Sequence, residues 1–163
     1  MGSDGLDGLL STVTVVGMIG FGLIAFLAPG IGKEWSAAVC GILAFALAGV
    51  AIGFLRFNHY PAQIFMGDTG SMFIGSVMVG IAVVLKIEFL LLLICFTCVM
   101  SSVSVILQRY YFKLTHGKRI FKMSPIHHHF EMCGMKETQI VAMYGIVTLA
   151  LGAVAVLSMY KWF

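Results

Sequence analysis

Five long stretches without a charged residue constrain this chain more than any other feature of its sequence. Each has about the length, 17 to 25 residues, that a helix needs to cross the hydrocarbon core of a bilayer. Hydrophobic residues make up 60% of the chain and charged residues only 10%, unlike a soluble domain. Because lipid offers the backbone no hydrogen bonds, the stretches are expected to be helices. The sequence predicts one all-α, polytopic integral membrane domain over residues 1–163, with about five transmembrane helices at 9–30, 35–55, 69–85, 89–108 and 138–160.

Positive charge is concentrated in the two longer links between these stretches. The link 56–68 contains Arg56, and the link 109–137 contains six lysines and arginines against two glutamates. The links near Lys33 and Lys86 are short and nearly neutral. Since loops rich in lysine and arginine stay in the cytoplasm, both longer links and the N-terminus are predicted to be cytoplasmic. The polar residues that could carry chemistry are therefore expected on one side of the membrane.

The first polar cluster, Asp4-Gly-Leu-Asp7-Gly8, comes directly before the first stretch. Two carboxylates three residues apart share a helical face, where they could bind a cation or accept hydrogen bonds from a ligand. An equally good interpretation is a helix N-cap with a favourable charge at the helix dipole. The spacing alone does not separate the two.

The second cluster is the segment 57–71, in which Pro61 blocks helix continuation and Gly67 and Gly70 flank Asp68. Mg²⁺ prefers one or two carboxylates, several waters and the phosphate oxygens of a substrate, so Asp68 is a candidate ligand of a Mg²⁺–diphosphate site. Backbone N–H groups at the following helix start could also face an anion. The alternative is that Asp68 only caps the third span, but acidic residues near a membrane favour a functional role.

The third cluster contains three adjacent histidines, His127, His128 and His129, after the basic run 118–122. Consecutive side chains on a helix diverge by about 100°, so the three rings cannot easily bind one ion. Imidazoles beside basic residues suit phosphate binding or a proton-linked role. A loop that contacts anionic lipid is the alternative, and it explains the lysines well but the histidines poorly.

These clusters resemble the motifs of one enzyme family. The run F-N-x-x-P-A-x-x-F-M-G-D-T-G-S over residues 57–71 looks like the signature of the polyprenyl-phosphate N-acetylhexosamine-1-phosphate transferases. K-R-I-F-K-M-S-P-I-H-H-H-F-E over 118–131 is similar to the branch of phospho-N-acetylmuramoyl-pentapeptide transferases. Sister enzymes that use UDP-N-acetylglucosamine have a differently spaced histidine motif. D-G-L-D-G at residues 4–8 is similar to the end of the family motif N-L-T-D-G-L-D-G.

The resemblance implies an activity and a site. Such enzymes move phospho-MurNAc-pentapeptide from UDP to undecaprenyl phosphate, giving lipid I and UMP for peptidoglycan synthesis, on the cytoplasmic face of the bacterial inner membrane. The matching positions imply Asp68 as the Mg²⁺ ligand, and Asp68, His127 and His128 as catalytic residues. The implied substrate-binding residues are Asp4 and Asp7 at the nucleotide, Phe65 stacked on uracil, Gln108 beside the same pocket, and His127, His128 and His129 at the diphosphate.

The resemblance also implies a partner. Family members have roughly twice as many spans, and their earlier D-D-x-x-K motif and preceding lysine-bearing loop have no counterpart here. Met1-Gly-Ser stands where the family has Asn-Leu-Thr. We therefore expect a C-terminal half in the lipid bilayer that requires an N-terminal half and is inactive alone. A homodimer is left open, and no nucleic-acid partner is expected.

Three alternatives accompany this expectation. A related transferase would use another UDP-N-acetylhexosamine, and a non-catalytic membrane half would bind nucleoside ligands without turnover. A small ion or proton transporter would use the histidines as a relay. The transporter is the weakest, because it needs polar residues through the spans, and these offer mainly serine, threonine and glycine.

Overall fold

The computed structural model describes residues 6–27, 34–115 and 118–162, and all regular structure within these ranges is helical. This confirms the all-α prediction. The described helices are α1 (Leu9–Leu27), α2 (Glu34–Asn58), α3 (Gly67–Leu85), α4 (Glu88–Ile94), α5 (Phe96–Leu114), α6 (Ile126–Met132) and α7 (Glu137–Trp162).

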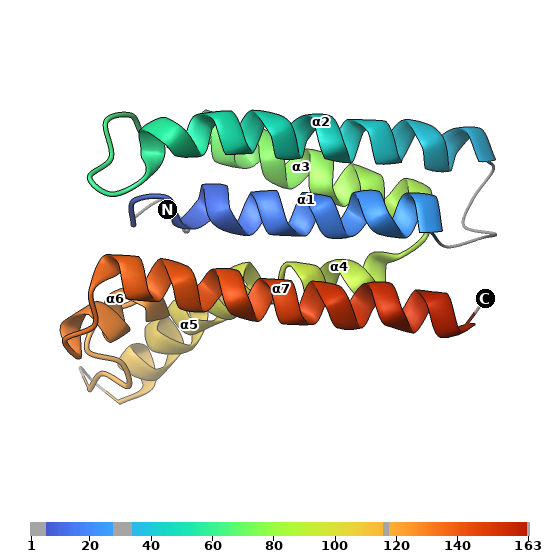
Figure 1. The fold of residues 1–163 in the computed structure, drawn as a ribbon. Helices are drawn as coiled ribbons and strands as arrows, with labels where there is room; N and C mark the ends of the chain where they lie inside the picture. The colour runs from blue at the N-terminus through green and yellow to red at the C-terminus, as the bar shows by residue number, and fades with distance from the viewer. Residues whose placement is uncertain (1–5, 28–33, 116–117, 163) are drawn as a thin grey trace.

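Four helices, α1, α2, α3 and α7, are each long and apolar enough to cross a membrane, which supports the predicted multi-pass protein. Their axes are roughly aligned, with α2 running opposite to α1, and α1 packs between α2 and α7 (Figure 1). Helix α2 continues past its predicted end to Asn58, and α3 begins two residues before its predicted start, at Gly67. The last residues of the first predicted span, 28–30, lie outside the described ranges.

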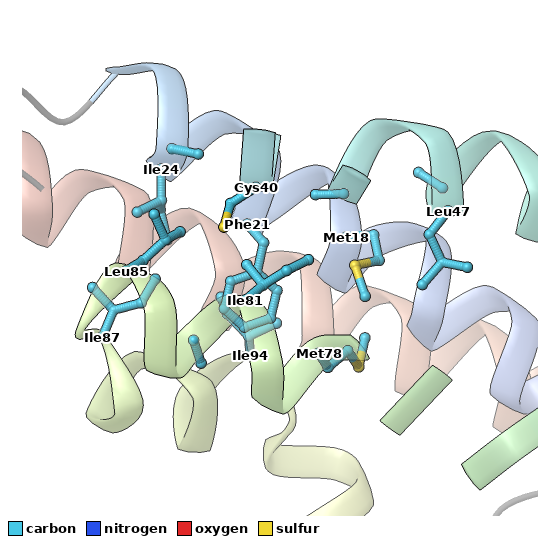
Figure 2. Close-up of a cluster of buried hydrophobic side chains, with 14 of the residues drawn as sticks. Met18, Phe21, Ile24, Cys40, Leu47, Met78, Ile81, Leu85, Ile87 and Ile94 are labelled. Carbon is cyan, nitrogen blue, oxygen red and sulfur yellow. The ribbon is translucent and has the colours of Figure 1, made fainter. Parts of the chain in front are cut away.

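The core lies around α1. Met18, Phe21 and Ile24 of this helix are buried, and they belong to one cluster with side chains from α2, α3 and α4 (Figure 2). Gly17 lets α3 and α4 approach closely, since a Cβ atom there would lie 3.1 Å from the Met78 side chain and 3.2 Å from that of Ile94. Small residues at helix contacts are the usual basis of close packing in lipid.

The fourth predicted span, 89–108, differs from the single helix expected. The chain forms α4 and α5, which are bent by 80° at Cys95, and α5 continues to Leu114. The bend brings hydroxyl groups of α5 to α7: Thr97 Oγ1 lies 3.1 Å from Thr148 Oγ1, and Ser101 Oγ lies 3.5 Å from the hydroxyl of Tyr144. Polar side chains in an apolar bundle are stabilised by such contacts between helices. The described part thus has four spans, or five if the bent pair counts as one.

The predicted polar clusters meet at one end of the bundle. The start of α1, the α2–α3 loop and helix α6 lie at the same end in Figure 1. A hydrogen bond of 2.9 Å from the Ala62 backbone N–H to Asp7 Oδ2 joins the first two of these segments. The fold therefore positions one polar surface, on which the candidate site is built.

Candidate active site

Asp7 binds the loop between α2 and α3. Its carboxylate accepts the hydrogen bond from the Ala62 N–H, which directly follows Pro61 and therefore lies where the loop turns. The backbone at Gly8 has φ of +79°, a conformation that favours glycine, and a Cβ atom there would lie 3.3 Å from Leu55. Asp7 therefore has a structural role at the candidate site. Its predicted companion, Asp4, lies outside the described residues.

Asn58, at the end of α2, is a site residue that sequence reasoning missed. Its side chain is buried and accepts a 2.9 Å hydrogen bond from Ser11 Oγ of α1. Its amide Nδ2 donates a 3.0 Å bond to the carbonyl oxygen of Ile64. Asn58 thus ties α1 to the loop immediately before Phe65. The signal in the sequence was an asparagine three residues before a proline. This pattern indicates a turn, but it does not show which residues the side chain bonds to.

Asp68 lies in the first turn of α3, and both it and Phe65 are exposed. The helix has no side-chain cap, since Met66 occupies the N-cap position without a capping hydrogen bond. Gly67, which lies between Met66 and Asp68, has φ of +68°. Among the described residues, the Asp68 carboxylate makes no hydrogen bond and no ion pair. These observations disfavour a pure capping role and leave the carboxylate available to a ligand.

A groove of about 580 Å³ runs from Asp68 along the bundle. Asp68 and Ser71 form its polar end, and methionine, leucine, valine and cysteine side chains form most of the remainder. The lining includes Leu91, Leu92 and Cys95 at the bend, and Cys98 and Val99 in α5. The break in the fourth span therefore helps to shape this apolar groove, which has the Asp68 carboxylate at one end.

The three histidines have different hydrogen-bond surroundings, but the rings of His127 and His128 lie with their centroids 4.5 Å apart and so do not diverge as the helical spacing predicted. His128 Nδ1 lies 3.0 Å from Glu131 Oε2, the one ion pair found within the described ranges. His129 Nδ1 accepts a 3.2 Å hydrogen bond from the Lys122 backbone N–H. In the part of the chain that the structure describes, no group of three His, Cys, Asp or Glu side chains could hold a metal ion.

His127 points into the protein. Its side chain is fully buried, and neither ring nitrogen has a hydrogen-bond partner among the described residues. Its ring lies edge-on to Tyr144 of α7, with the centroids 6.5 Å apart. The resemblance implied substrate contact by all three histidines. In this structure the His127 ring is enclosed where α6 packs on α7, and there it helps to hold α6 on the bundle.

Acidification is expected to destabilise the protein through His127. Burial, with a smaller contribution from His128, lowers the pKa of His127 from 6.5 to about 4, and Glu131 opposes this shift. The unfolded chain therefore binds a proton that the folded chain excludes between these values, so stability is lost as the pH falls from 6.5 towards 4. Thermal unfolding of the purified chain at pH 7 and pH 5 measures this loss. A His127→Asn variant should be less stable at pH 7 but depend less on pH.

The matched control is His59→Asn, which changes an exposed histidine of the α2–α3 loop and should keep the pH dependence of the unmodified chain. An unchanged pH dependence in His127→Asn would contradict the role given to burial.

Gln108 fixes the segment that precedes the histidines. Its Oε1 accepts hydrogen bonds from the backbone N–H groups of Ile120, at 3.2 Å, and Phe121, at 3.0 Å. Its Nε2 donates a 3.2 Å bond to the carbonyl oxygen of Phe121. The amide is therefore largely committed to holding this segment against α5. The sequence pointed to Gln108 only through the family resemblance, which did not indicate these backbone partners.

A cavity of about 300 Å³ connects the α2–α3 loop with the histidine segment. It is lined by Tyr60 of the loop, Glu131 of α6, and Glu137 and Thr138 at the start of α7, together with Met135 and Lys136. The loop that Asp7 holds and Glu131, the partner of His128, thus border the same space. All three sequence clusters contribute to one end of the bundle, where an anionic ligand would meet both acidic and basic groups.

The glycosyl transferase family 4 profile matches residues 3–86, slightly more than half of the chain. The chain belongs to glycosyl transferase family 4. The region that matches the family includes Asp7, Asn58, Phe65 and Asp68, which are the residues that build the loop and its carboxylate.

Curated relatives of this chain are named phospho-N-acetylmuramoyl-pentapeptide-transferase. The chain is 47% identical over 157 residues to the protein of Clostridium kluyveri, and 44% identical over 157 residues to that of Clostridium acetobutylicum. These matches cover 96% of this chain but 47% of each relative. The protein of Clostridium novyi is 44% identical over 98% of this chain and 46% of its own length. The chain spans about half the length of the curated relatives it matches.

Proposed function

We propose that this chain contributes the nucleotide and metal side of a phospho-N-acetylmuramoyl-pentapeptide transferase. The reaction would transfer phospho-MurNAc-pentapeptide from UDP to undecaprenyl phosphate. A lipid phosphate oxygen would form a bond to the phosphorus next to the sugar, the bond from that phosphorus to the bridging oxygen would break, and UMP would leave. The observation that carries the proposal is an exposed Asp68, bonded through its carboxylate to no described residue, at the polar end of an apolar groove in a chain similar to named transferases along nearly all of its length.

The nucleotide would bind over the α2–α3 loop. Phe65 is 59% exposed and directly follows Ile64, whose carbonyl oxygen Asn58 holds, so its ring is available to stack on uracil. Asp7 would act on this pocket through the hydrogen bond that fixes the loop, and Asp4 would line the pocket beside it. The residues that bind the base are then positioned by α1 and α2 before the substrate arrives.

The donor set at Asp68 fits Mg²⁺. One exposed carboxylate, with room for waters and for the phosphate oxygens of a substrate, is the arrangement in which Mg²⁺ is usually bound. When bound, the ion would neutralise the negative charge that builds up on the diphosphate. Asp68 would hold it at the start of α3, where backbone N–H groups of the helix also favour an anion.

The acceptor lipid would occupy the groove of about 580 Å³ that begins at Asp68. Its largely apolar lining suits an isoprenoid chain, and its polar end would present the lipid phosphate to the diphosphate. His128 and His129, which are half-buried on α6, would contact the diphosphate, since imidazoles and nearby lysines are donors to phosphate oxygens. His127 would act by holding α6 in place.

The site would face the cytoplasm of a bacterial cell and lie in its inner membrane. Arg56, Arg109, Arg119 and most lysines of the chain fall in the links 56–68 and 109–137. The α2–α3 loop and α6, which belong to these links, lie at the end that contains the site (Figure 1). Loops with this excess of positive charge are retained on the cytoplasmic side. UDP-linked substrate and undecaprenyl phosphate would then meet at the membrane boundary.

Metal removal tests the proposal. The complemented chain is this chain co-produced with the part of the Clostridium kluyveri relative that it does not match. It should release UMP from UDP-MurNAc-pentapeptide only when undecaprenyl phosphate and Mg²⁺ are both present. A chelator in excess should reduce release to background, and added Mg²⁺ should restore it, because the diphosphate charge is then neutralised again. The chain alone should release none.

Other outcomes of this assay favour the alternatives. UMP release from UDP-N-acetylglucosamine instead would indicate a related UDP-N-acetylhexosamine transferase. Binding of a nucleoside inhibitor without any turnover by the complemented chain would indicate a non-catalytic membrane half. Chelator-resistant release of UMP would contradict the role of Mg²⁺.

A further inference from the structure

The buried side of α5 is polar, although most of the helix is apolar. The structure describes every residue of α5, and the four that are buried are Thr97, Ser101, Ser104 and Gln108. Their spacing of four, three and four residues places them along one face of the helix, while most exposed positions from 96 to 107 are apolar. Because a buried hydroxyl or amide is costly without a hydrogen-bond partner, this face is expected to bind other segments of the chain.

Ser104 bonds to the first residue of α6. Its Oγ accepts a 3.1 Å hydrogen bond from the backbone N–H of Ile126. Its hydroxyl donates a 2.6 Å bond to the carbonyl oxygen of Ser101 within α5. Since the hydroxyl proton is directed at Ser101, the lone pairs of the oxygen are left to accept from Ile126. Both hydrogen bonds of this buried side chain therefore go to backbone groups, and one of them joins α5 to α6.

Helix α6 depends on such contacts, because it has only seven residues. A helix of this length is unstable alone, so its position is decided by the rest of the protein. The N–H groups of a first helical turn have no partners within the helix, and a side chain at the N-cap position usually accepts from them. Pro125 occupies the N-cap position of α6 and makes no such hydrogen bond. Ser104, which lies 22 residues before Ile126, supplies the missing acceptor from another helix.

The side chain of Ile126 is fixed as well as its N–H. It is buried in a cluster that includes Leu9 of α1 and Tyr144 of α7. His128 and Glu131 follow on the same short helix with 3.0 Å between their side chains, and Glu131 lines the cavity beside the α2–α3 loop. A shift at the start of α6 would therefore move both side chains relative to that cavity.

We propose that Ser104 is a positioning residue of the candidate site, which caps α6 from α5 and thereby sets the place of His128 at the diphosphate. The role of His128 in this inference rests on the proposed transferase function, whereas the cap does not. Ser104 would not touch the substrate, because its side chain is buried and bonds to the backbone on both sides. Without its hydroxyl, the Ile126 N–H loses its partner and α6 can move away from the position that the reaction requires.

Hydrogen–deuterium exchange of the full chain in detergent, measured by mass spectrometry, tests the cap without any need for activity. In Ser104→Ala, peptides that cover residues 126–132 should exchange about fivefold faster than in the unmodified chain, since the first turn of α6 opens more often. Ser104→Thr keeps the hydroxyl and should restore most of the protection. Unchanged exchange in Ser104→Ala would overturn the cap.

The matched control is Thr97→Val, which removes another buried hydroxyl from the same face of α5 and keeps the shape of the side chain. Thr97 Oγ1 contacts Thr148 of α7, and it lies about two turns from Ser104. Thermal unfolding should show a loss of stability, but exchange of residues 126–132 should not change. An equal increase of exchange in Thr97→Val would overturn the cap in favour of a general effect of buried hydroxyl groups.

Kinetics of the complemented chain test the positioning role. Ser104→Ala should lower kcat/KM for UMP release about tenfold, mainly through kcat, because His128 would contact the diphosphate where negative charge builds up. Ser104→Thr should recover most of this loss, and Thr97→Val should keep a rate near that of the unmodified chain. Faster exchange in Ser104→Ala with unchanged kcat/KM would overturn the positioning role.

Two further outcomes remain decisive. If the unmodified complemented chain releases no UMP, the proposed function fails, and exchange of residues 126–132 still decides whether Ser104 caps α6. If Ser104→Ala does not fold, as judged by circular dichroism, Ser104→Cys takes its place in both assays. The thiol is close in size to the hydroxyl but is a weak hydrogen-bond acceptor, so the same losses are expected.

Discussion

Replacing Asp68 with asparagine is expected to lower UMP release by the complemented chain by a factor of about 10² to 10³. The substitution keeps the size of the side chain but removes the negative charge that would hold Mg²⁺ at the diphosphate. Because the Asp68 carboxylate is exposed and bonds to no described residue, the fold should not change. Initial rates at saturating substrate, with Mg²⁺ varied over a wide range, measure the effect. A higher Mg²⁺ requirement should accompany the lower rate.

A matched control for Asp68→Asn is Glu88→Gln. Glu88 is also exposed and also lies in the first turn of a helix, α4, but it is near the opposite end of α3. Its change to an amide should leave the rate within about twofold, the range expected for an exposed charge without a partner. A normal rate in Asp68→Asn would remove Asp68 from the site, and an equal loss in Glu88→Gln would point to a general effect of helix-terminal charge.

Replacing Asn58 with alanine is expected to reduce kcat/KM of the complemented chain by about 10- to 100-fold. The side chain bonds to both Ser11 and Ile64, so its loss leaves a buried hydroxyl and a carbonyl without their partner. An unpaired buried polar group costs about 1–3 kcal/mol, and the loop that carries Phe65 and leads to Asp68 would shift. Because a misplacement of about 1 Å can cost 10²-fold in rate, the loss should exceed that expected from stability alone.

Two comparisons isolate the positioning role of Asn58. Ser11→Ala removes one of its two hydrogen bonds and should lose less activity than Asn58→Ala. Gln63→Ala changes an exposed side chain of the same loop, and rates near those of the unmodified chain are expected. Steady-state kinetics and thermal unfolding, measured on all three variants, separate the two effects. A less stable Asn58→Ala protein with normal kcat/KM would show that Asn58 serves the fold and not the site.

The bend at Cys95 shows where prediction from sequence stopped. Residues 94–96 are Ile94-Cys95-Phe96, with neither proline nor glycine to indicate a break in the helix. The uncharged length from 89 to 108 therefore predicted one straight span. Beyond the break, hydroxyl groups of α5 reach Thr148 and Tyr144 of α7, residues more than 40 positions away. Periodicity within a segment carries no information on such partners.

The histidines show a similar division. Their spacing predicted that the rings diverge, but the rings of His127 and His128 lie with their centroids only 4.5 Å apart. It did not predict that His127 would be the buried ring, because that depends on how α6 packs on α7 and thus on Tyr144. The contact between His128 and Glu131 is local, at a separation of three residues, so it could have been predicted from the sequence of this segment alone.

By itself, the sequence determined that the chain is helical and crosses a membrane several times, because uncharged lengths and the lack of backbone partners in lipid allow little else. It also determined the three polar clusters that resemble the transferase family. Only the tertiary structure decided how these clusters combine. The contacts Asp7–Ala62 and Ser11–Asn58 join positions 55 and 47 residues apart, and the groove at Asp68 is lined by α3 together with residues on both sides of the bend in the fourth span. Such contacts follow from packing of whole helices, which no local pattern of residues specifies.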